Sequence, residues 1–485
     1  MPVIGLVGNG GAMAAAGRRA AAAALAAVLM VVTGCTGGDP TLRAGADGFR
    51  PGAEGIGDPY FPRYGNGGYD VAHYRLELRY DPDTDRLTGV ATITATASQD
   101  LSRFNLDLAG LTVRSVQVDG VEARHERDGD ELVITPAKGL PRQTRFTTRI
   151  DYEGVPEPLI SGDFGAGGFM ATPDGAIALG QPESASTWFP VNDHPSDKAT
   201  YDIEITVPEG KSALSNGVPQ GTRTVDGWTT WRWSEPEPMA SYLATLVIGD
   251  YRVRTGEHRG RPMVTAVASG LAANAAAEAS LARTGEIADF LADRFGPYPF
   301  AAYGGIVVSD DRIRYALETQ SRPVYSPVFF RSGPNDGVVA HELAHQWFGN
   351  SVSIRRWADL WLNEGFATYA EWLWAEHDGG EPVSETFTRE YAATDWSQPA
   401  LDPGRAGIFS RAVYKRGALA VHALRLAVGD ELFFRILRTW TAERRASNAV
   451  TSDLVSVAER VSGQRLGPLF DTWLTGTTAP PVPSR

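Results

Sequence analysis

Alternating apolar and polar residues dominate the first half of the chain. Strict alternation occurs in residues 74–80 (YRLELRY), 104–108 (FNLDL) and 201–207 (YDIEITV). A period of two places every second side chain on one face of a strand, so these segments predict strands with a single buried face. Strands of this kind are typical of antiparallel sheets. We therefore expect residues 60–252 to form a β domain.

Four Asx-Gly pairs supply turns for this domain. They are Asp119-Gly120, Asp128-Gly129, Asn216-Gly217 and Asp226-Gly227. Tight hairpins need positive φ angles, which Gly, Asn and Asp adopt most readily. We therefore expect hairpins at these pairs, in keeping with antiparallel sheets.

The hydrophobic pattern changes after residue 252. Residues 271–294 are rich in Ala and Leu at helical spacing, and the apolar run 305–308 (GIVV, starting at Gly305) predicts a strand. Most of the later chain has helical periodicity. We predict an α+β multidomain protein in which the β domain is followed by a mainly α domain over residues 253–485.

Composition and charge exclude some classes of function. The chain has 485 residues, 43% of them hydrophobic, which is enough for more than one packed core. Its formal net charge is -13 and aromatic residues make up 10%. A nucleic-acid-binding protein normally has a basic face, so we expect a globular protein without a nucleic-acid partner.

The N-terminal segment has the pattern of an export signal. Arg18 and Arg19 precede an apolar run over residues 20–32, which is too short to span a bilayer and ends at Thr33-Gly34-Cys35. The segment resembles bacterial lipoprotein signals, and this resemblance implies that residues 1–34 are removed and Cys35 is acylated. The alternative is an ordinary signal followed by an ordinary buried cysteine.

The start of translation and the segment after Cys35 complete this interpretation. Met1 and Met13 are both candidate start residues. Residues 35–59 are rich in Gly, Ala, Asp and Pro, which predicts a flexible tether. We expect an exported protein that faces the outside of a bacterial cell envelope and contacts the membrane only through the lipid on Cys35. Because Cys35 is the only cysteine, the chain can form no internal disulfide and no Cys-based metal site.

The segment His341-Glu342-Leu343-Ala344-His345 is an H-E-x-x-H motif. Residues four apart on a helix lie on the same face, so both imidazoles can reach one cation. Glu342 lies one step round the helix, where it can activate a zinc-bound water instead of binding the metal.

A catalytic zinc site needs a third protein ligand and one open position. Glu364 lies in the segment 361–367 (WLNEGFA), and eighteen residues separate it from His345. That gap lets one helix end, the chain turn and a second, antiparallel helix present Glu364. Two histidines and a glutamate form the thermolysin-type ligand set. We therefore predict one Zn²⁺ per chain, held by His341, His345 and Glu364, and a further donor for the oxyanion of the reaction.

These motifs, together with residues 295–300 (FGPYPF) and 188–200 (WFPVNDHPSDKAT), resemble the M1 family of zinc aminopeptidases. This family of gluzincins is related to aminopeptidase N and leukotriene A4 hydrolase. The resemblance covers roughly residues 60–475. It implies an N-terminal β-saddle domain followed by a thermolysin-like catalytic domain. It also implies a short form without the large C-terminal helical domain of many members.

The resemblance implies roles for three further residues. Tyr414, in the segment 414–417 (YKRG), matches the tyrosine that donates a hydrogen bond to the oxyanion. Glu318 matches the glutamate of the family's exopeptidase motif, which binds the free α-amine of the substrate. Gln181 matches the second amine-binding residue, and Glu183 is the alternative for that role.

The exopeptidase segment 315–319 (YALET) departs from the family pattern at two positions. Tyr315 replaces a glycine and Thr319 replaces an asparagine. The backbone of this motif approaches the substrate, so these replacements bear on the shape of the pocket for the first substrate residue.

Three functions are compatible with these observations. The first is a zinc metallopeptidase that releases N-terminal residues from peptides. The second is a zinc endopeptidase that needs no free N-terminus, if the altered motif no longer selects one. The third is a non-catalytic envelope lipoprotein that uses zinc only to hold its fold. Glu342 and Tyr414 argue against the third, because a closed structural site needs neither residue. The sequence carries no signal for the oligomeric state.

Overall fold

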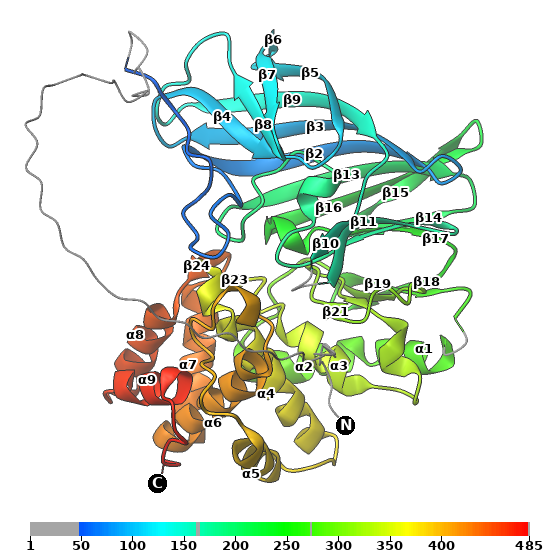
Figure 1. The fold of residues 1–485 in the computed structure, drawn as a ribbon. Coiled ribbons are helices and arrows are strands. Elements are labelled where there is room, and N and C mark those ends of the chain that lie inside the picture. Colours follow the sequence, from blue (N-terminus) through cyan, green and yellow to red (C-terminus); the bar gives the residue numbers. More distant parts are fainter. Residues whose placement is uncertain (1–47, 162–164, 272–273, 484–485) are drawn as a thin grey trace, which may run out of the picture.

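The computed structural model describes residues 48–161, 165–271 and 274–483. The predicted signal (residues 1–34) and Cys35 lie outside these residues. Strands dominate the upper half of the molecule in Figure 1, and helices coloured from green to red form most of the lower half. The expected order, a β-rich N-terminal domain followed by a mainly helical domain, is confirmed. Among the described residues, no helix is long and apolar enough to cross a membrane.

An eight-stranded sheet forms the body of the β domain. Its strand order is β15-β16-β13-β2-β3-β9-β5-β6. The strands are β2 (Tyr69–Asp81), β3 (Arg86–Ala97), β5 (Thr112–Val118), β6 (Val121–Glu122), β9 (Arg145–Gly154), β13 (Lys198–Pro208), β15 (Val218–Val225) and β16 (Trp228–Ala240). Buried and exposed residues alternate along β2 and β13, as the sequence pattern predicts.

The pairing of this sheet differs from the antiparallel prediction at one place. Strands β2 and β13 run parallel, with Leu76 opposite Ile203. More than a hundred residues separate the two strands in sequence (Tyr69–Asp81 and Lys198–Pro208), so no hairpin links them and their alternating pattern does not define their direction. The pairs Asp119-Gly120, Asp128-Gly129 and Asp226-Gly227 do form hairpins, between β5 and β6, β7 and β8, and β15 and β16.

Two smaller sheets complete the β domain. One has the order β1-β4-β8-β7, from β1 (Arg50–Pro51), β4 (Leu101–Asp107), β7 (Arg124–Asp128) and β8 (Glu131–Thr135). The other has the order β10-β11-β12-β17-β14, from β10 (Leu159–Ser161), β11 (Gly165–Thr172), β12 (Gly175–Leu179), β14 (Ser212–Ser215) and β17 (Leu246–Gly249). The predicted hairpin at Asn216-Gly217 is wrong, because this pair leads from β14 of this sheet to β15 of the large one.

The predicted tether does not extend to residue 59. Strand β1 pairs in parallel with β4 from Arg50 on. Asp58 is buried, and its carboxylate accepts a hydrogen bond from the backbone N–H of Trp357 at 2.9 Å. Backbone hydrogen bonds and a buried carboxylate therefore hold this Gly-rich segment against both domains, although its composition alone resembles a linker.

The helical domain begins with a five-stranded sheet of the order β18-β19-β20-β22-β21. Its strands are β18 (Tyr251–His258), β19 (Arg261–Ala268), β20 (Tyr303–Val307), β21 (Ala316–Leu317) and β22 (Val324–Tyr325). Strand β20 matches the predicted run at residues 305–308. Strand β21 lies at the edge of the sheet, immediately before Glu318.

Nine α-helices of the described residues form the rest of this domain, in the lower half of Figure 1. They are α1 (Asn274–Ala282), α2 (Thr284–Phe295), α3 (Asp336–Ala344), α4 (Trp361–His377), α5 (Val383–Ala393), α6 (Gly417–Val428), α7 (Asp430–Glu443), α8 (Thr451–Ser462) and α9 (Gly467–Thr475). Every residue of α4 from Trp361 to Ala370 is buried. A helix that is buried on all sides is a core helix, and α4 therefore presents its polar residues to the interior of the domain.

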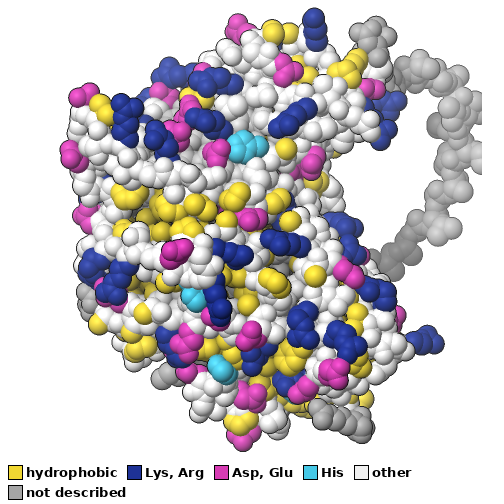
Figure 2. Space-filling model, turned by 180° about the vertical axis from the view of Figure 1, so that it is seen from behind, with side chains coloured by type: hydrophobic (Ala, Val, Ile, Leu, Met, Phe, Trp, Pro, Cys, Tyr) yellow, Lys and Arg dark blue, Asp and Glu magenta, His cyan; other side chains and the backbone are white. Residues whose placement is uncertain are grey.

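Charges of both signs cover the outside of the molecule. On the face shown in Figure 2, acidic and basic side chains are interspersed over the upper and lower parts, and hydrophobic side chains form a band between them. Many of these charges form ion pairs, such as Arg75 with Glu77 and Arg259 with Asp289. Exposed pairs of this kind contribute little to stability.

Candidate active site

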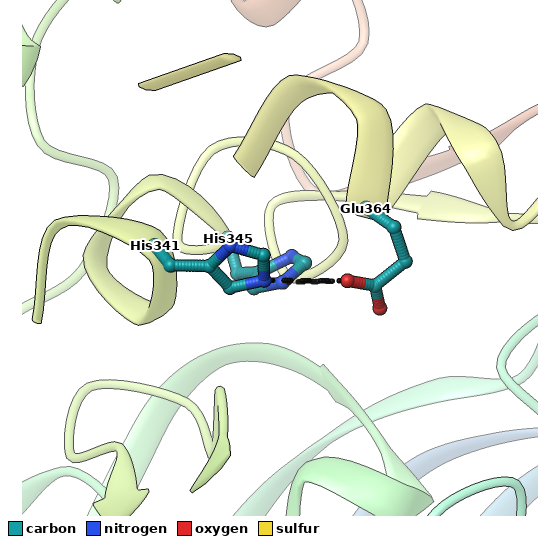
Figure 3. A group of neighbouring side chains, drawn as sticks. All are labelled: His341, His345 and Glu364. Atoms are coloured by element: carbon teal, nitrogen blue, oxygen red, sulfur yellow. Dashed lines mark hydrogen bonds and ion pairs between the residues drawn. The ribbon is translucent and has the colours of Figure 1, made fainter. Parts of the chain in front are cut away.

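Two helices bring the predicted metal ligands together. His341 lies in α3 and His345 follows directly after it, while Glu364 lies in the first turn of α4. Figure 3 shows the two imidazoles and the Glu364 carboxylate pointing toward one another. Glu364 Oε2 lies 3.3 Å from His341 Nε2 and 3.4 Å from His345 Nε2. All three side chains are buried.

These distances fit a tetrahedral zinc ion. Bonds of about 2.0–2.1 Å at a tetrahedral angle place two ligand atoms roughly 3.3 Å apart. The observed separations of 3.3 and 3.4 Å agree with that value. Two imidazole nitrogens and a carboxylate oxygen are also a usual donor set for zinc. The residues present therefore fit the metal that the sequence predicts.

Both histidines use Nδ1 to hold their rings in place. His341 Nδ1 lies 2.5 Å from Glu371 Oε1, and His345 Nδ1 donates to the carbonyl oxygen of Phe348 at 3.0 Å. A proton on Nδ1 leaves Nε2 free to bind a metal. Carboxylate and carbonyl partners of this kind orient ligand histidines and increase their basicity.

Glu371 was not among the residues predicted from the sequence. It lies seven residues after Glu364 on α4, and a spacing of seven places two residues on the same face of a helix. That spacing could have indicated that Glu371 lies near the metal ligands. The polar residues nearer to Glu364 do not hold the rings: Asp359 accepts hydrogen bonds from the backbone N–H and the hydroxyl of Thr451, at 2.9 and 2.6 Å.

Charge strongly couples the ligand residues. Burial opposes ionisation of Glu364, but the two imidazoles outweigh it and lower the pKa of this carboxyl to about 2. Burial also opposes charge on His345, yet the carboxylates of Glu364 and Glu318 raise its pKa to about 9. A histidine must be neutral to bind zinc, so metal binding releases protons and weakens as the pH falls.

Glu342 lies beside the metal ligands without joining them. Its carboxylate oxygen, a ring nitrogen of His345 and a carboxylate oxygen of Glu318 lie within 4.8 Å of one another. Burial raises the pKa of Glu342 to about 8, although the two imidazoles act to lower it. A carboxylate beside the metal ligands is a side chain that can act as a general base.

Tyr414 lies in a π-helical turn (η6, Ala412–Arg416) that leads into α6. Its half-buried ring lies parallel to the ring of His341, with a centroid distance of 6.2 Å. Its hydroxyl faces the Glu364 carboxylate. Burial and the nearby carboxylates raise the pKa of Tyr414 well above its usual value, so the hydroxyl keeps its proton and can donate it in a hydrogen bond.

Two glycines let the helices that carry Glu364 and Tyr414 approach each other. Gly365 follows Glu364 on α4, and Gly417 begins α6 after the π-helical turn. A Cβ atom on Gly365 would lie 2.8 Å from the carbonyl carbon of Gly417. Side chains at these positions would therefore push the two helices apart.

Glu318 and Gln181 both lie next to Tyr242. Glu318 follows the edge strand β21, and its buried carboxylate accepts a hydrogen bond from Tyr242 Oη at 2.9 Å. Gln181 follows β12 in the β domain, and its side chain faces the same Tyr242 hydroxyl. The structure thus places Glu318, Gln181 and the metal ligands around one site. Glu183 is held by a hydrogen bond from Tyr64 instead.

The two residues that depart from the exopeptidase pattern both form hydrogen bonds with the backbone of the surrounding protein. Tyr315 Oη donates to the carbonyl oxygen of Ala166 on β11 at 3.3 Å. Thr319 is buried, and its hydroxyl donates to the carbonyl oxygen of Arg322 at 2.6 Å. Neither replacement displaces Glu318 from its place beside Glu342 and His345.

Two family models match the chain, one in each half. The model of the peptidase M1 N-terminal domain matches residues 71–243, and that of the peptidase family M1 domain matches residues 289–473. The curated relatives include glutamyl aminopeptidase of Rattus norvegicus, 26% identical over 84% of this chain and 47% of its own length. They also include aminopeptidase N of Lactococcus lactis, 26% identical over 83% of this chain and 50% of its own length. The chain spans about half the length of these curated relatives.

Solved structures of similar length also match. The crystal structure of an M1 zinc metallopeptidase from Deinococcus radiodurans is 33% identical, with a TM-score of 0.81, and the match covers 89% of this chain and 99% of that one. A mutant of the Deinococcus enzyme bound to a Tyr-Ser-Ala substrate is 32% identical, with a TM-score of 0.82 and the same coverage.

Proposed function

The chain belongs to peptidase family M1, and we propose on this premise that it is a zinc-dependent metallopeptidase that removes residues from the N-termini of peptides. The position of Glu318 carries this proposal. Its carboxylate lies within 4.8 Å of the Glu342 and His345 ligand atoms, so a group that binds an ammonium ion adjoins the metal and the base. The M1 relatives named above are aminopeptidases, and one M1 structure holds a tripeptide.

The residues of the site have complementary roles in hydrolysis. His341, His345 and Glu364 would hold zinc, which polarises the scissile carbonyl and makes water more acidic. Glu342 takes a proton from the attacking water and passes it to the leaving amine. Tyr414 donates a hydrogen bond to the oxyanion that develops on the substrate carbonyl.

Glu318 selects the end of the peptide. A carboxylate binds an N-terminal ammonium group through a charge-assisted hydrogen bond. Because Glu318 is adjacent to Glu342, an ammonium bound there leaves room for one residue between the amine and the bond that is cut. The enzyme therefore cleaves the first peptide bond. An endopeptidase would have no need of a buried carboxylate at this position.

The ligand geometry also supports one zinc ion per chain. Among the described residues, two groups of side chains have metal-ligand spacing: His341, His345 and Glu364, and Glu318, Glu342 and His345. Both groups include His345, so they cannot hold two independent ions with separate ligand sets. We expect metal analysis of the purified protein to give one zinc per chain.

Matched peptides with free and acetylated N-termini test the activity. We expect the zinc-loaded protein to cleave the free peptide at its first bond, to leave the acetylated peptide intact, and to lose activity with a chelator. Equal cleavage of both peptides would favour the endopeptidase. A protein that binds zinc but cleaves neither would be the non-catalytic lipoprotein.

We also propose that the protein is exported and anchored to the cell membrane through a lipid on Cys35. The support lies in the sequence: Arg18 and Arg19, the short apolar run 20–32, and the small residue before Cys35. A Cys35→Ser variant should move from the membrane fraction to the soluble fraction. The native protein should carry a lipid mass on an N-terminal Cys35 peptide. A Cys35→Ser protein that stays in the membrane fraction would contradict the anchor.

A further inference from the structure

Tyr242 is a buried residue of the β domain that reaches the site in the helical domain. It lies in a single 3-10 turn, η2 (Ser241–Leu243), and is 1% exposed. Its hydroxyl donates to Glu318 Oε1 at 2.9 Å, and Glu318 is 2% exposed. Nothing in the local sequence pattern of Tyr242 distinguishes it from an ordinary core tyrosine.

The turn that carries Tyr242 is fixed on both sides. Ser241 Oγ donates to a carboxylate oxygen of Asp193 at 2.7 Å. The carbonyl oxygen of Leu243 accepts a hydrogen bond from the side-chain amide of Asn216 at 2.9 Å. These contacts restrict the ring of Tyr242, so its hydroxyl is a fixed donor and not a mobile one.

The backbone of Glu318 is held separately from its side chain. Its carbonyl oxygen accepts hydrogen bonds from Gln346 Nε2 at 3.2 Å and from Asn350 Nδ2 at 2.7 Å. Both amides belong to the segment that follows the H-E-x-x-H motif. The helical domain therefore fixes where Glu318 lies, while Tyr242 of the β domain fixes where its carboxylate points.

The carboxylate needs such a donor because of its surroundings. It is buried next to two other carboxylates, those of Glu342 and Glu364, and like charges repel it at this distance. The hydrogen bond from Tyr242 is made to Oε1, one of the two carboxylate oxygens. The side chain of Gln181 faces the same hydroxyl. One phenol group thus lies between both residues assigned to the substrate amine.

We propose that Tyr242 is a positioning residue that aims the Glu318 carboxylate at the N-terminal ammonium group of the substrate. This inference rests on the proposed function of Glu318. It also gives the β domain a part in substrate selection: the β domain supplies the donor that completes an amine site whose carboxylate belongs to the helical domain.

Two zinc-binding inhibitors separate this role from a structural one. The first is L-leucine hydroxamate, and the second is its analogue in which hydrogen replaces the amino group. Both bind the metal, so the ratio of their inhibition constants reports the contribution of the amine alone. We expect the zinc-loaded wild-type protein to bind the amine-bearing inhibitor at least about tenfold more tightly.

In Tyr242→Phe we expect this ratio to fall by about tenfold, while the inhibition constant of the analogue without the amine stays within twofold of wild type. With peptide substrates, KM should rise more than kcat falls. The matched control is Tyr152→Phe, which removes another buried hydroxyl, bound to the carbonyl oxygen of Trp188 at 2.9 Å, within the β domain. It should leave the ratio unchanged.

The outcomes distinguish this inference from the function beneath it. If wild type binds both inhibitors equally, the amine-binding role of Glu318 fails. If Glu318→Gln loses the preference but Tyr242→Phe keeps it, only the role of Tyr242 fails. A Tyr242→Phe protein that binds both inhibitors more weakly by the same factor shows a structural role and overturns the proposal. If Tyr242→Phe does not fold, Ser241→Ala, which frees the same turn, should lower the ratio by a smaller factor; an unchanged ratio there would also overturn it.

Discussion

The metal-binding side and the amine-binding side of the site are built in different ways. The zinc ligands lie between residues 341 and 364, on two consecutive helices that pack against each other. The proposed amine-binding side combines Gln181 and Tyr242 of the β domain with Glu318 of the helical domain. Helix periodicity places the predicted metal ligands, whereas the packing of two domains places the residues proposed to bind the substrate amine. The two sides should therefore respond differently to mutation.

Glu342→Gln should give the largest effect. It tests whether zinc binding and catalysis depend on different residues of the metal-binding side. The variant keeps all three zinc ligands but loses the group that moves the proton. We expect zinc content close to wild type and a decrease in kcat of about 10³-fold. Glu385→Gln, an exposed change on α5, serves as the control. Retained activity in Glu342→Gln would refute the general-base role.

Glu371→Ala gives an intermediate effect that is confined to the metal side. Without its carboxylate partner, the ring of His341 loses its orienting hydrogen bond. We expect zinc affinity to fall by about 10–100-fold in a competition assay with a chelator. At saturating zinc, the preference for the amine-bearing hydroxamate should remain. A loss of that preference with zinc bound would mean that the two sides are not independent.

The third effect, which leaves the site unchanged, concerns the β domain and pH. Burial, with Asp70 nearby, raises the pKa of Asp197 to about 8. Its folded pKa lies above its unfolded pKa, so the stability it contributes is complete below the unfolded value and is lost as the pH rises toward 8. The free energy of unfolding of the wild type should therefore decrease between pH 6 and pH 8. In Asp197→Asn we expect this decrease to be smaller by about 2 kcal/mol.

Urea unfolding at the two pH values measures this difference. The neighbouring Lys198, whose pKa burial lowers to about 7, contributes with the opposite sign in both proteins, so it cancels in the comparison. Equal pH dependence in wild type and Asp197→Asn would show that Asp197 is ionised in the folded protein.

The sequence predicts the metal side better than the amine side for a physical reason. The spacing of His341, His345 and Glu364 reflects helix geometry, which local sequence determines. The position of Glu371 follows the same helix geometry, so it could have been predicted from the sequence. The role of Tyr242 could not, because it depends on a contact with a residue 76 positions away in another domain.

The same limit applies to the fold. Alternation predicts the strands and their buried faces, but the parallel pairing of β2 with β13 depends on long-range packing. Residues 50–59 have the composition of a tether and are nevertheless held, through contacts with β4 and Trp357 that composition does not encode. Asn216-Gly217 has the dipeptide of a hairpin, yet its chain crosses between two sheets.

The contact between Gly365 and Gly417 matters for interpreting the effects of substitutions in this enzyme. Neither residue has a functional group, and neither would touch a substrate. Their lack of side chains nevertheless sets how far the Glu364 carboxylate lies from the Tyr414 hydroxyl, because a Cβ on Gly365 would collide with backbone at 2.8 Å. A single methyl group there would alter the alignment of the Glu364 carboxylate with the Tyr414 hydroxyl. Chemically inert positions can therefore be as intolerant of change as the residues that take part in the reaction.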